Sequence, residues 1–398
     1  MMRLAKGAIV GSFFAAACIT TAAQADEQYV IGLTADLTGP ASTTYQPLAE
    51  GARAYIEKVN AEGGVNGRSI RLRVRDSRSD PSEVVGDVNY FDDQGVLGNI
   101  FVSPSGTLGA YAQTNASAQI PTVYINACYP PATPPTPDPN FFCPGLSTLS
   151  DAYASVDFMI EMMEGEDIKM AFVTTDIPGA RGAAEQIMKP YAEQQGVEVF
   201  DVAVMPVGTT DAGSIARRFD NNGVNAVVSY TLSHHMLAGA EALTSRDWDG
   251  KYLLTSYLPG VFSTLEDLRE PNIYAWDQFS LPTDGMPVHE EMRETAEDFG
   301  FDFHLADLRM GYRGAMTLVA ALEECGWPCD RDSLREVMNH LTVDNQEMLD
   351  LNLDPVVFTP TNHTGPYKTY RLYHWSDEEG AIVKAPFDDI VREEVDWE

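Results

Sequence analysis

The sequence predicts an α/β fold built from two doubly wound, Rossmann-like lobes, each with a parallel central sheet. Short apolar runs of the kind that form buried parallel strands recur along the chain. Segments with helical spacing alternate with these runs, and turns that contain Gly, Pro or Asn separate them. The alternation starts again near residue 150, which indicates a second lobe of the same architecture.

The first strand–helix–strand unit lies between residues 30 and 76. Its first strand is the apolar run Val30-Ile31-Gly32-Leu33, and a helix with apolar residues at helical spacing follows from about Pro47. Residues 62–67 include glycines that tolerate positive φ, and residues 69–76 alternate like a strand. Such a unit predicts two parallel strands joined by a right-handed crossover.

The rest of the chain continues this alternation. Strands are expected at 99–102, 122–125, 170–173, 197–205, 226–230, 252–255 and 274–279, with helices between them. Later helices are expected at 308–323 and 333–341. Residues 355–358 and 368–375 have the pattern of an antiparallel pair, and the acidic end after Phe387 is expected to be a short strand or a tail.

The first 25 residues have the pattern of a secretory signal peptide. A short basic segment precedes the apolar run 7–17, and Ala23-Gln24-Ala25 supplies the small residues of a cleavage site. The apolar run is shorter than the roughly 20 residues that a membrane-spanning helix needs. A lipid anchor on Cys18 is the alternative, although the residues before it match a lipoprotein signal poorly. We therefore expect cleavage after Ala25 and an exported, soluble chain.

The chain is strongly acidic, with 26 Lys and Arg against 59 Asp and Glu and a formal net charge of −33. Two of the basic residues and none of the acidic ones lie in the leader, so the exported chain would carry 24 − 59 = −35. Such a surface repels nucleic acid and anionic membranes, so we expect neither as a partner. A hydrated surface suited to a saline habitat explains this charge more simply than an acid-loving partner does.

Four cysteines remain after the leader: Cys128, Cys143, Cys325 and Cys329. An even number in an oxidising compartment indicates disulfides, and of the three possible pairings the local one, Cys128–Cys143 with Cys325–Cys329, fits best. The first bridge would hold the proline-rich segment 129–139, which cannot hold itself in place. A four-cysteine metal site is the competing interpretation, but neither pair has the spacing of a metal knuckle.

A set of short motifs follows in a fixed order between residues 32 and 77. They are Gly32-Leu33-Thr34, Leu37-Thr38-Gly39-Pro40, Glu50-Gly51-Ala52, Val59-Asn60-Ala61-Glu62-Gly63-Gly64-Val65-Asn66-Gly67 and Arg75-Asp76-Ser77. This stretch resembles the opening of the branched-chain-amino-acid-type periplasmic binding proteins of ABC transporters. The order and spacing of so many motifs is far more specific than a lone glycine motif. An unrelated doubly wound domain is the alternative.

The resemblance implies the type I periplasmic binding protein fold, in which two lobes are joined by three crossover segments. By this resemblance the N-terminal lobe takes residues 26–147 plus 282–368, and the C-terminal lobe takes 148–281 plus 369–398. It implies a monomeric periplasmic receptor that closes over a small molecule and delivers it to the permease subunits of an ABC importer. An exported sensor of the same fold is the alternative function. No nucleophile elbow, zinc motif or phosphate loop occurs, so we expect neither an enzyme nor a cofactor.

The family's first-lobe ligand contacts fall on the loops after the strands 99–102 and 122–125. Carried over by position, they are Ser105, Gly106, Thr107, Asn126 and Cys128, which would hold a ligand carboxylate through hydroxyl and amide groups. The last two belong to Asn126-Ala127-Cys128, which departs from the usual Ala-Ala-Thr, and a disulfide would occupy Cys128. Thr44, Tyr45 and Thr148 complete the contacts expected here, with Tyr45 in a loop where the family often has glycine.

The contacts expected on the second lobe are Asp176, Tyr230 and Tyr257. Amino-acid binders of this family hold the ligand ammonium with an acidic residue after a late strand, but that position falls on or beside Tyr257 here. Burying an ammonium group without a carboxylate partner costs several kcal/mol. Tyrosines can stack on a planar ligand. We therefore expect a small carboxylate, with an aromatic acid or an amino-acid-like compound as the candidates.

Two pairs of residues invite other interpretations. His234-His235 is expected in a loop, where adjacent histidines cannot easily face one ion, so we expect no metal site and consider a hydrogen bond to the ligand instead. Arg309 and Arg313 lie one turn apart on a helix and could reach the ligand, with a solvated or salt-bridged face as the alternative.

Overall fold

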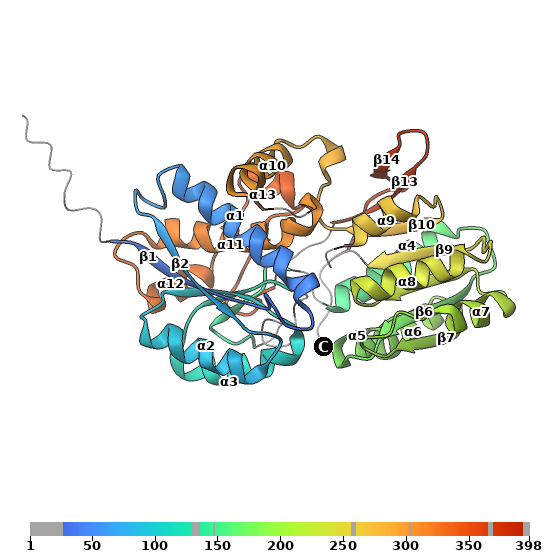
Figure 1. Cartoon of the computed structure of the whole chain (residues 1–398), viewed down its shortest axis with the longest axis horizontal. Helices are drawn as coiled ribbons and strands as arrows, with labels where there is room; N and C mark the ends of the chain where they lie inside the picture. Colours follow the sequence, from blue (N-terminus) through green and yellow to red (C-terminus); the bar gives the residue numbers. More distant parts are fainter. Residues whose placement is uncertain are drawn as a thin grey trace, which may run out of the picture.

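The computed structural model describes residues 27–126, 128, 132, 136–145, 148–255, 260–301, 304–364 and 369–392. Figure 1 shows two α/β lobes side by side along the long axis of the molecule. Each lobe has a central sheet, and helices cover both faces of that sheet. The predicted fold class is therefore confirmed.

The sheet of the first lobe contains five parallel strands in the order β2-β1-β3-β4-β5. They are β1 (Tyr29–Ala35), β2 (Ile70–Asp76), β3 (Gly98–Val102), β4 (Thr122–Tyr124) and β5 (Phe141–Phe142). The strand order reverses direction between β1 and β3. Ile31 and Leu33 of β1 are fully buried, because helices exclude water from this parallel sheet on both sides.

Four long helices cover the first sheet, two on each face. One face carries α1 (Ser42–Ala61) and α11 (Leu305–Cys325), and the other carries α2 (Pro81–Asp93) and α3 (Ser105–Ala118). Smaller helices of the later chain pack around α11: α10 (Pro287–Phe299), α12 (Arg331–Met338) and α13 (Gln346–Leu351). On either side of α13 in the chain, β11 (Thr342–Val343) and β12 (Val356–Val357) form an antiparallel pair. The first lobe thus combines an early and a late part of the chain.

The sheet of the second lobe repeats the same strand order. Its parallel part runs β7-β6-β8-β9-β10. These strands are β6 (Lys169–Thr175), β7 (Glu198–Met205), β8 (Ala226–Tyr230), β9 (Lys251–Thr255) and β10 (Ile273–Asp277). Three late strands extend it in antiparallel fashion: β13 (Thr369–Ser376), β14 (Ala381–Lys384) and β15 (Ile390–Val391).

Helices also cover both faces of the second sheet. One face carries α7 (Gly213–Asn221), α8 (Ser233–Thr244) and α9 (Val261–Leu268), and the other carries α4 (Thr148–Met162) and the run α5 (Pro178–Gly182), η2 (Ala183–Met188), α6 (Lys189–Gln194). Along β6 the buried side chains alternate between these layers. Met170 and Phe172 belong to the apolar cluster with α4, whereas Ala171 and Val173 belong to the cluster with α7 and α8.

The chain passes between the two lobes three times. The passages lie between β5 and α4, between β10 and η3 (Pro282–Asp284), and between β12 and β13. The predicted lobe boundaries fall within these passages, but residues 147 and 368 lie outside the described residues. We therefore keep the predicted boundaries as a proposal.

One predicted strand pairing is wrong. Residues 355–358 do not pair with 368–375; β12 pairs with β11, and β13 lies beside β10 in the second sheet. The register partners Trp276 and Leu372 are both buried there. The local pattern identifies the strands, but the burial gained in the distant sheet decides the partner.

Several helices begin earlier than the sequence predicts. α11 and α12 start three and two residues early, at Leu305 and Arg331, and two other helices differ by more. α1 begins at Ser42, so Thr44 and Tyr45 lie in its first turn and not in a loop. α8 begins at Ser233, so the two histidines that follow are helical as well. Proline is common at helix starts, and Pro47 therefore placed the predicted start of α1 too late.

Both predicted disulfides are present. Cys128–Cys143 joins the loop after β4 to the residue after β5, and Cys325–Cys329 spans the end of α11. The N–H of Cys143 also donates to the carbonyl of His363 (2.8 Å). The buried bridge therefore ties the proline-rich loop to the first sheet, although residues 129–131 and 133–135 of that loop lie outside the described residues.

Residues 1–26 also lie outside the described residues, so the signal peptide stays a prediction. None of the helices in the described part of the chain combines the length and the apolar character needed to cross a membrane.

Helices α1 and α11 touch through glycine. A Cβ atom on Gly51 would lie 2.0 Å from the carbonyl oxygen of Leu308, and one on Gly311 would lie 1.8 Å from that of Leu48. Both distances are far inside van der Waals contact, so only glycine lets these two backbones approach so closely. In contrast, a Cβ on Gly86 within α2 would meet no atom within 4 Å.

Gly311→Ala should therefore push α1 and α11 apart and lower the free energy of unfolding by roughly 3 kcal/mol, as overpacking of a filled interior does. Gly86→Ala is the matched control and should raise it by about 0.5–1 kcal/mol, because alanine is the better helix former. Urea unfolding followed by circular dichroism measures both. Equal stability of the two variants would contradict the close helix contact.

Candidate functional site

Each sheet reverses its strand order at one place, and open α/β sheets bind ligands beside such reversals, at the carboxyl ends of the strands. The reversal lies between β1 and β3 in the first lobe and between β6 and β8 in the second. The loops after these strands begin at Asp36, Ser103, Asp176 and Thr231. These loops and their neighbours form the candidate site.

The loop after β3 leads directly into α3. The N–H groups of Ser105 and Gly106, the first two residues of this helix, have no acceptor among the described residues. Ser105 is partly buried and Gly106 is exposed. Thr107 is buried, and its hydroxyl lies 2.9 Å from Ser103 Oγ and donates to the Pro104 carbonyl (2.8 Å). The threonine therefore braces the loop, while the serine and glycine present their donors outward.

Asn126 links the end of β4 to the start of α1. Its Nδ2 donates to the hydroxyl oxygens of Tyr45 and Tyr124, each at 3.0 Å. Tyr124 is fully buried and stacks on Phe101, so it belongs to the interior of the lobe. Tyr45 and Asn126 are each 5 % exposed, and Thr44 is buried beside them in the sequence. The structure thus brings the predicted Tyr45 and Asn126 together at the edge of the first sheet.

The disulfide Cys128–Cys143 lies directly behind Asn126. The sulfur of Cys143 is 3.7 Å from the Asn126 carbonyl oxygen, and a Cβ on Gly145 would lie 2.8 Å from the same oxygen. Cys128 is buried and its sulfur is committed to the bridge. The bridge and the glycine thus support the Asn126 loop from its inner side.

Thr175, the last residue of β6, connects the two strands at the reversal in the second lobe. Its Oγ1 accepts the N–H of Leu232 (3.1 Å) and lies 2.8 Å from Nδ1 of His235. Burial lowers the pKa of His235 to about 4, and the neighbouring His234 adds to this effect. The fully buried imidazole is therefore neutral near pH 7 and serves as a support for this edge of the sheet.

Asp176 follows Thr175 and is exposed. Its Oδ1 lies 3.2 Å from Arg181, which also contacts Glu185 at 2.9 Å. Exposed ion pairs of this kind contribute at most about 1 kcal/mol, so a ligand group could replace them. Tyr230, at the end of β8, is 2 % exposed.

The two remaining predicted contacts are less fully described. Tyr257 lies outside the described residues. Thr148 is the first residue of α4, directly after the first passage between the lobes. Its backbone position is compatible with a site between the two sheets.

Asp277, the last residue of β10, begins the passage back to the first lobe. Its Oδ2 lies 2.5 Å from Nη2 of Arg309 in α11, and its Oδ1 accepts the N–H groups of Gln278 (2.7 Å) and Phe279 (3.2 Å). Burial raises the pKa of Asp277, and Arg309 opposes this shift. Removing one partner of a buried pair costs roughly 3–5 kcal/mol, so this pair fixes the passage to α11.

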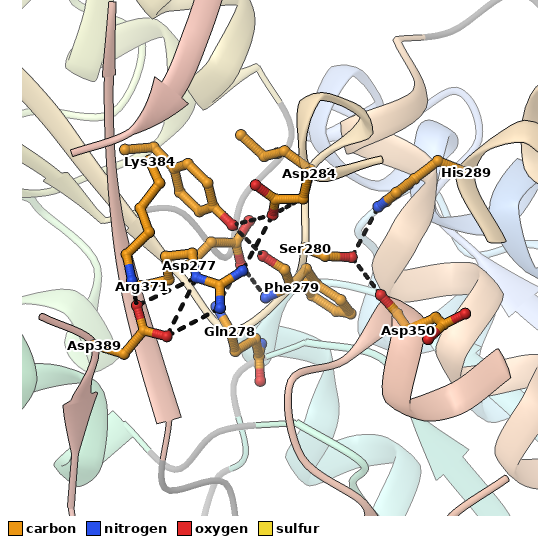
Figure 2. A network of polar contacts seen from close by, with 12 residues as sticks. Asp277, Gln278, Phe279, Ser280, Asp284, His289, Asp350, Arg371, Lys384 and Asp389 are labelled. Atoms are coloured by element: carbon orange, nitrogen blue, oxygen red, sulfur yellow. Dashed lines mark hydrogen bonds and ion pairs between the residues drawn. The ribbon is translucent and has the colours of Figure 1, made fainter. Parts of the chain in front are cut away.

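Figure 2 shows the polar network around the same passage. Ser280 Oγ lies 2.8 Å from His289 Nε2, in α10 of the first lobe. Arg371 of β13 pairs with Asp284 of η3 (3.3 Å) and with Asp389 (3.0 Å). The network therefore joins first-lobe helices to second-lobe strands.

The sequence indicated Arg309, on the first-lobe side of this passage, but not its partner Asp277 at the end of β10. Arg309 and Arg313 are both buried, so the solvated helix face is wrong and the salt-bridged alternative holds for Arg309. Arg313 donates to Asn352 (3.0 Å).

The sequence analysis also missed the supporting role of Thr175, although a polar residue at the end of an apolar strand could have signalled it.

A family model described as "Periplasmic binding protein" matches residues 28–381. The match includes the parallel strands of both sheets and all three passages. The chain belongs to the periplasmic binding protein family. Within the described residues, no group of three or more His, Cys, Asp or Glu side chains is placed to hold a metal ion.

Similar proteins show which branch of the family this is. A Leu/Ile/Val-binding protein homolog of Brucella melitensis is 25 % identical over 315 residues, which cover 78 % of this chain and 82 % of the relative. This periplasmic binding protein is therefore of the branched-chain-amino-acid type, as the motifs between residues 32 and 77 indicate.

Two solved structures show the fold. A branched-chain amino acid ABC transporter protein from Thermus thermophilus with bound valine has a TM-score of 0.80 at 17 % identity, covering 92 % of this chain and 97 % of that one. A solute binding protein from R. palustris in complex with 4-hydroxybenzoate has a TM-score of 0.74 at 17 % identity, covering 93 % and 99 %. The type I periplasmic binding protein fold is thereby confirmed.

Membership of this family defines the general function. Its members are solute-binding receptors that bind small molecules and work with ABC transporters, and the family's description implies a periplasmic location. The predicted solute receptor is confirmed at this level.

Acid should destabilise this periplasmic binding protein through His235. Its folded-state pKa is about 4, against about 6.5 in an unfolded chain, so the unfolded state takes up the proton first. Above pH 6.5 the neutral imidazole contributes fully to the free energy of unfolding. This contribution, up to about 3 kcal/mol, is lost as the pH falls toward 4.

His235→Gln should show a smaller loss of unfolding free energy between pH 7 and pH 4.5 than the wild type, measured by urea unfolding at both pH values. His340→Gln, whose histidine side chain is 60 % exposed, is the control and should keep the wild-type pH dependence. An unchanged pH dependence of the His235 variant would show that its ring is not the buried neutral group described here.

Proposed function

We propose that this protein is the exported receptor of an ABC importer for a small carboxylate, with an aromatic acid as the preferred candidate. The two lobes close over the ligand, and the closed monomer delivers it to permease subunits in the inner membrane. A signal peptide of residues 1–25 would direct the chain to the periplasm. The observation that carries the ligand class is the start of α3.

The start of α3 offers a group of hydrogen-bond donors to a ligand. The N–H groups of Ser105 and Gly106 and the Ser105 hydroxyl lie at the N-terminus of a 14-residue helix, where the helix dipole is positive. Ser103 and Thr107 hold this turn in place through their hydroxyl groups. Such a group of donors fits the two oxygens of a carboxylate.

The acidic side chains at the strand ends favour a ligand without an ammonium group. Asp36, Asp76 and Asp277 follow or end strands, and each already accepts from loop N–H groups, with Arg309 as a further partner of Asp277. An ammonium group at these three positions would have to share or displace an existing bond, and at Asp176 it would have to replace the exposed pair with Arg181. A carboxylate without an ammonium group requires neither change, which favours it over a plain amino acid.

Aromatic side chains at the site support an aromatic acid. Tyr45 and Asn126 adjoin each other at the edge of the first sheet, and their polar groups could orient a planar ligand. The R. palustris protein of this fold is in complex with 4-hydroxybenzoate, whereas the Thermus protein has bound valine. The fold therefore accepts either ligand class, and both ligands carry a carboxylate that the start of α3 could hold. The preference for an aromatic acid rests on Tyr45 and on the acidic side chains that are already engaged.

Ser105→Ala should weaken the binding of 4-hydroxybenzoate about 10-fold or more, because a hydrogen bond to a charged group contributes roughly 1.5–3 kcal/mol. Ser117→Ala, at an exposed position near the other end of α3, is the matched control and should bind like the wild type. Isothermal titration with benzoate, 4-hydroxybenzoate, leucine and valine measures both variants and the wild type. Tight binding of leucine or valine without any aromatic acid would contradict the proposed ligand class, and equal affinities of the two variants would contradict the role of α3.

A further inference from the structure

The two lobes also touch through helices α11 and α9. α11 packs on α1 and on the first sheet, whereas α9 packs on α8, β10, β13 and β14 of the second lobe. Asp307, in the first turn of α11, accepts the N–H of Gly260, the residue before α9, at 2.7 Å. Between the same helices, His304 Nε2 and Glu266 Oε1 lie 3.5 Å apart. We call these two interactions the α9–α11 contact.

The start of α9 depends on this contact. The N-cap residue of α9 is Gly260, with a φ of +84°, so it has no side chain that could cap the helix. The hydroxyls of Ser263 and Thr264 donate to the Gly260 carbonyl (3.0 and 2.8 Å). Both polar groups of this residue are thus engaged, and the partner of its N–H comes from the other lobe.

Helix α11 holds the second lobe at two points, through two residues that lie two positions apart near its start. Asp307 holds the start of α9, and Arg309 holds Asp277 at the end of β10. Burial raises the pKa of Asp307, and the N–H of Gly260, together with the neighbouring His304 and Arg309, opposes this shift. α11 thus contacts the second lobe both at the start of α9 and at the end of β10.

We propose that Asp307 is a positioning residue that holds α9 against α11 and thereby sets the relative arrangement of the lobes in which the ligand binds. The hydrogen bond to Gly260 forms only while the two helices keep this spacing, so its loss widens the range of lobe arrangements and weakens ligand binding. The effect on affinity rests on the proposed function, whereas the effect on the lobes requires no ligand.

A cap within one lobe provides the matched control. Asp330 accepts the N–H of Ser333 (2.8 Å) at the start of α12, and among the described residues it has no hydrogen bond to the second lobe. Asp330→Ala removes a comparable helix cap without touching the α9–α11 contact. Asp307→Asn keeps an acceptor oxygen and tests whether a hydrogen bond, not the charge, is what matters.

Hydrogen exchange and small-angle X-ray scattering of the ligand-free protein test the proposal first. In Asp307→Ala the amide of Gly260 should exchange about 10-fold faster and the radius of gyration should change, while Asp330→Ala leaves both as in the wild type. Asp307→Asn should keep most of the protection. Unchanged exchange and scattering in Asp307→Ala, or equal changes in Asp330→Ala, would overturn the proposal.

Titration with 4-hydroxybenzoate tests the consequence for binding. Asp307→Ala should bind about 10-fold more weakly than the wild type, and Asp330→Ala should bind equally well. Equal or tighter binding by Asp307→Ala would overturn the inferred effect on the ligand. If the wild type does not bind this acid, the proposed ligand class fails, while exchange and scattering still decide the role of Asp307.

Discussion

The reversal of strand order, between β1 and β3 and again between β6 and β8, is the constraint on which the rest of this structure depends. Right-handed crossovers from such a reversal must place helices on opposite faces of the sheet. The loops at the reversal then meet at the carboxyl edge, and the helices that follow begin there with unpaired N–H groups. A chain with a formal net charge of −33 thereby acquires a local positive potential at the start of α3, where it can hold an anion.

The passages between the lobes connect the carboxyl edges of the two sheets. Buried residues of α4 and α11 belong to one continuous apolar cluster, so the lobes share part of their core. The buried pair of Asp277 and Arg309 fixes the passage after β10, and the bond from Asp307 to Gly260 adds a second attachment on the same helix. A ligand that changes the distance between the lobes must therefore also change the contacts of α11 with the second lobe. Closure requires only that the ligand prefer one lobe arrangement by a few kcal/mol.

Local signals sufficed for much of the fold. Apolar runs located most strands of the two sheets, whereas the short strands β5, β11 and β14 were not predicted. An even number of cysteines with short spacings indicated both disulfides. Pro47 concealed the true start of α1, and hence the helical position of Tyr45, because proline is also a start signal. The place of β13 beside β10 depends on burial in a distant sheet and has no local signature. The site shows the same limit. The resemblance to the family indicated Ser105 and Asn126, but the local sequence does not indicate Asp307 as the partner of Gly260, because it lies 47 residues away on the other lobe.

A crystal structure of the protein with 4-hydroxybenzoate would show directly whether the acid binds between the lobes at the start of α3. We expect it there chemically unaltered, with its carboxylate oxygens about 3 Å from the Ser105 hydroxyl and the Gly106 N–H. A ligand bound to one lobe alone, or with its carboxylate directed away from the start of α3, would rule out this binding mode.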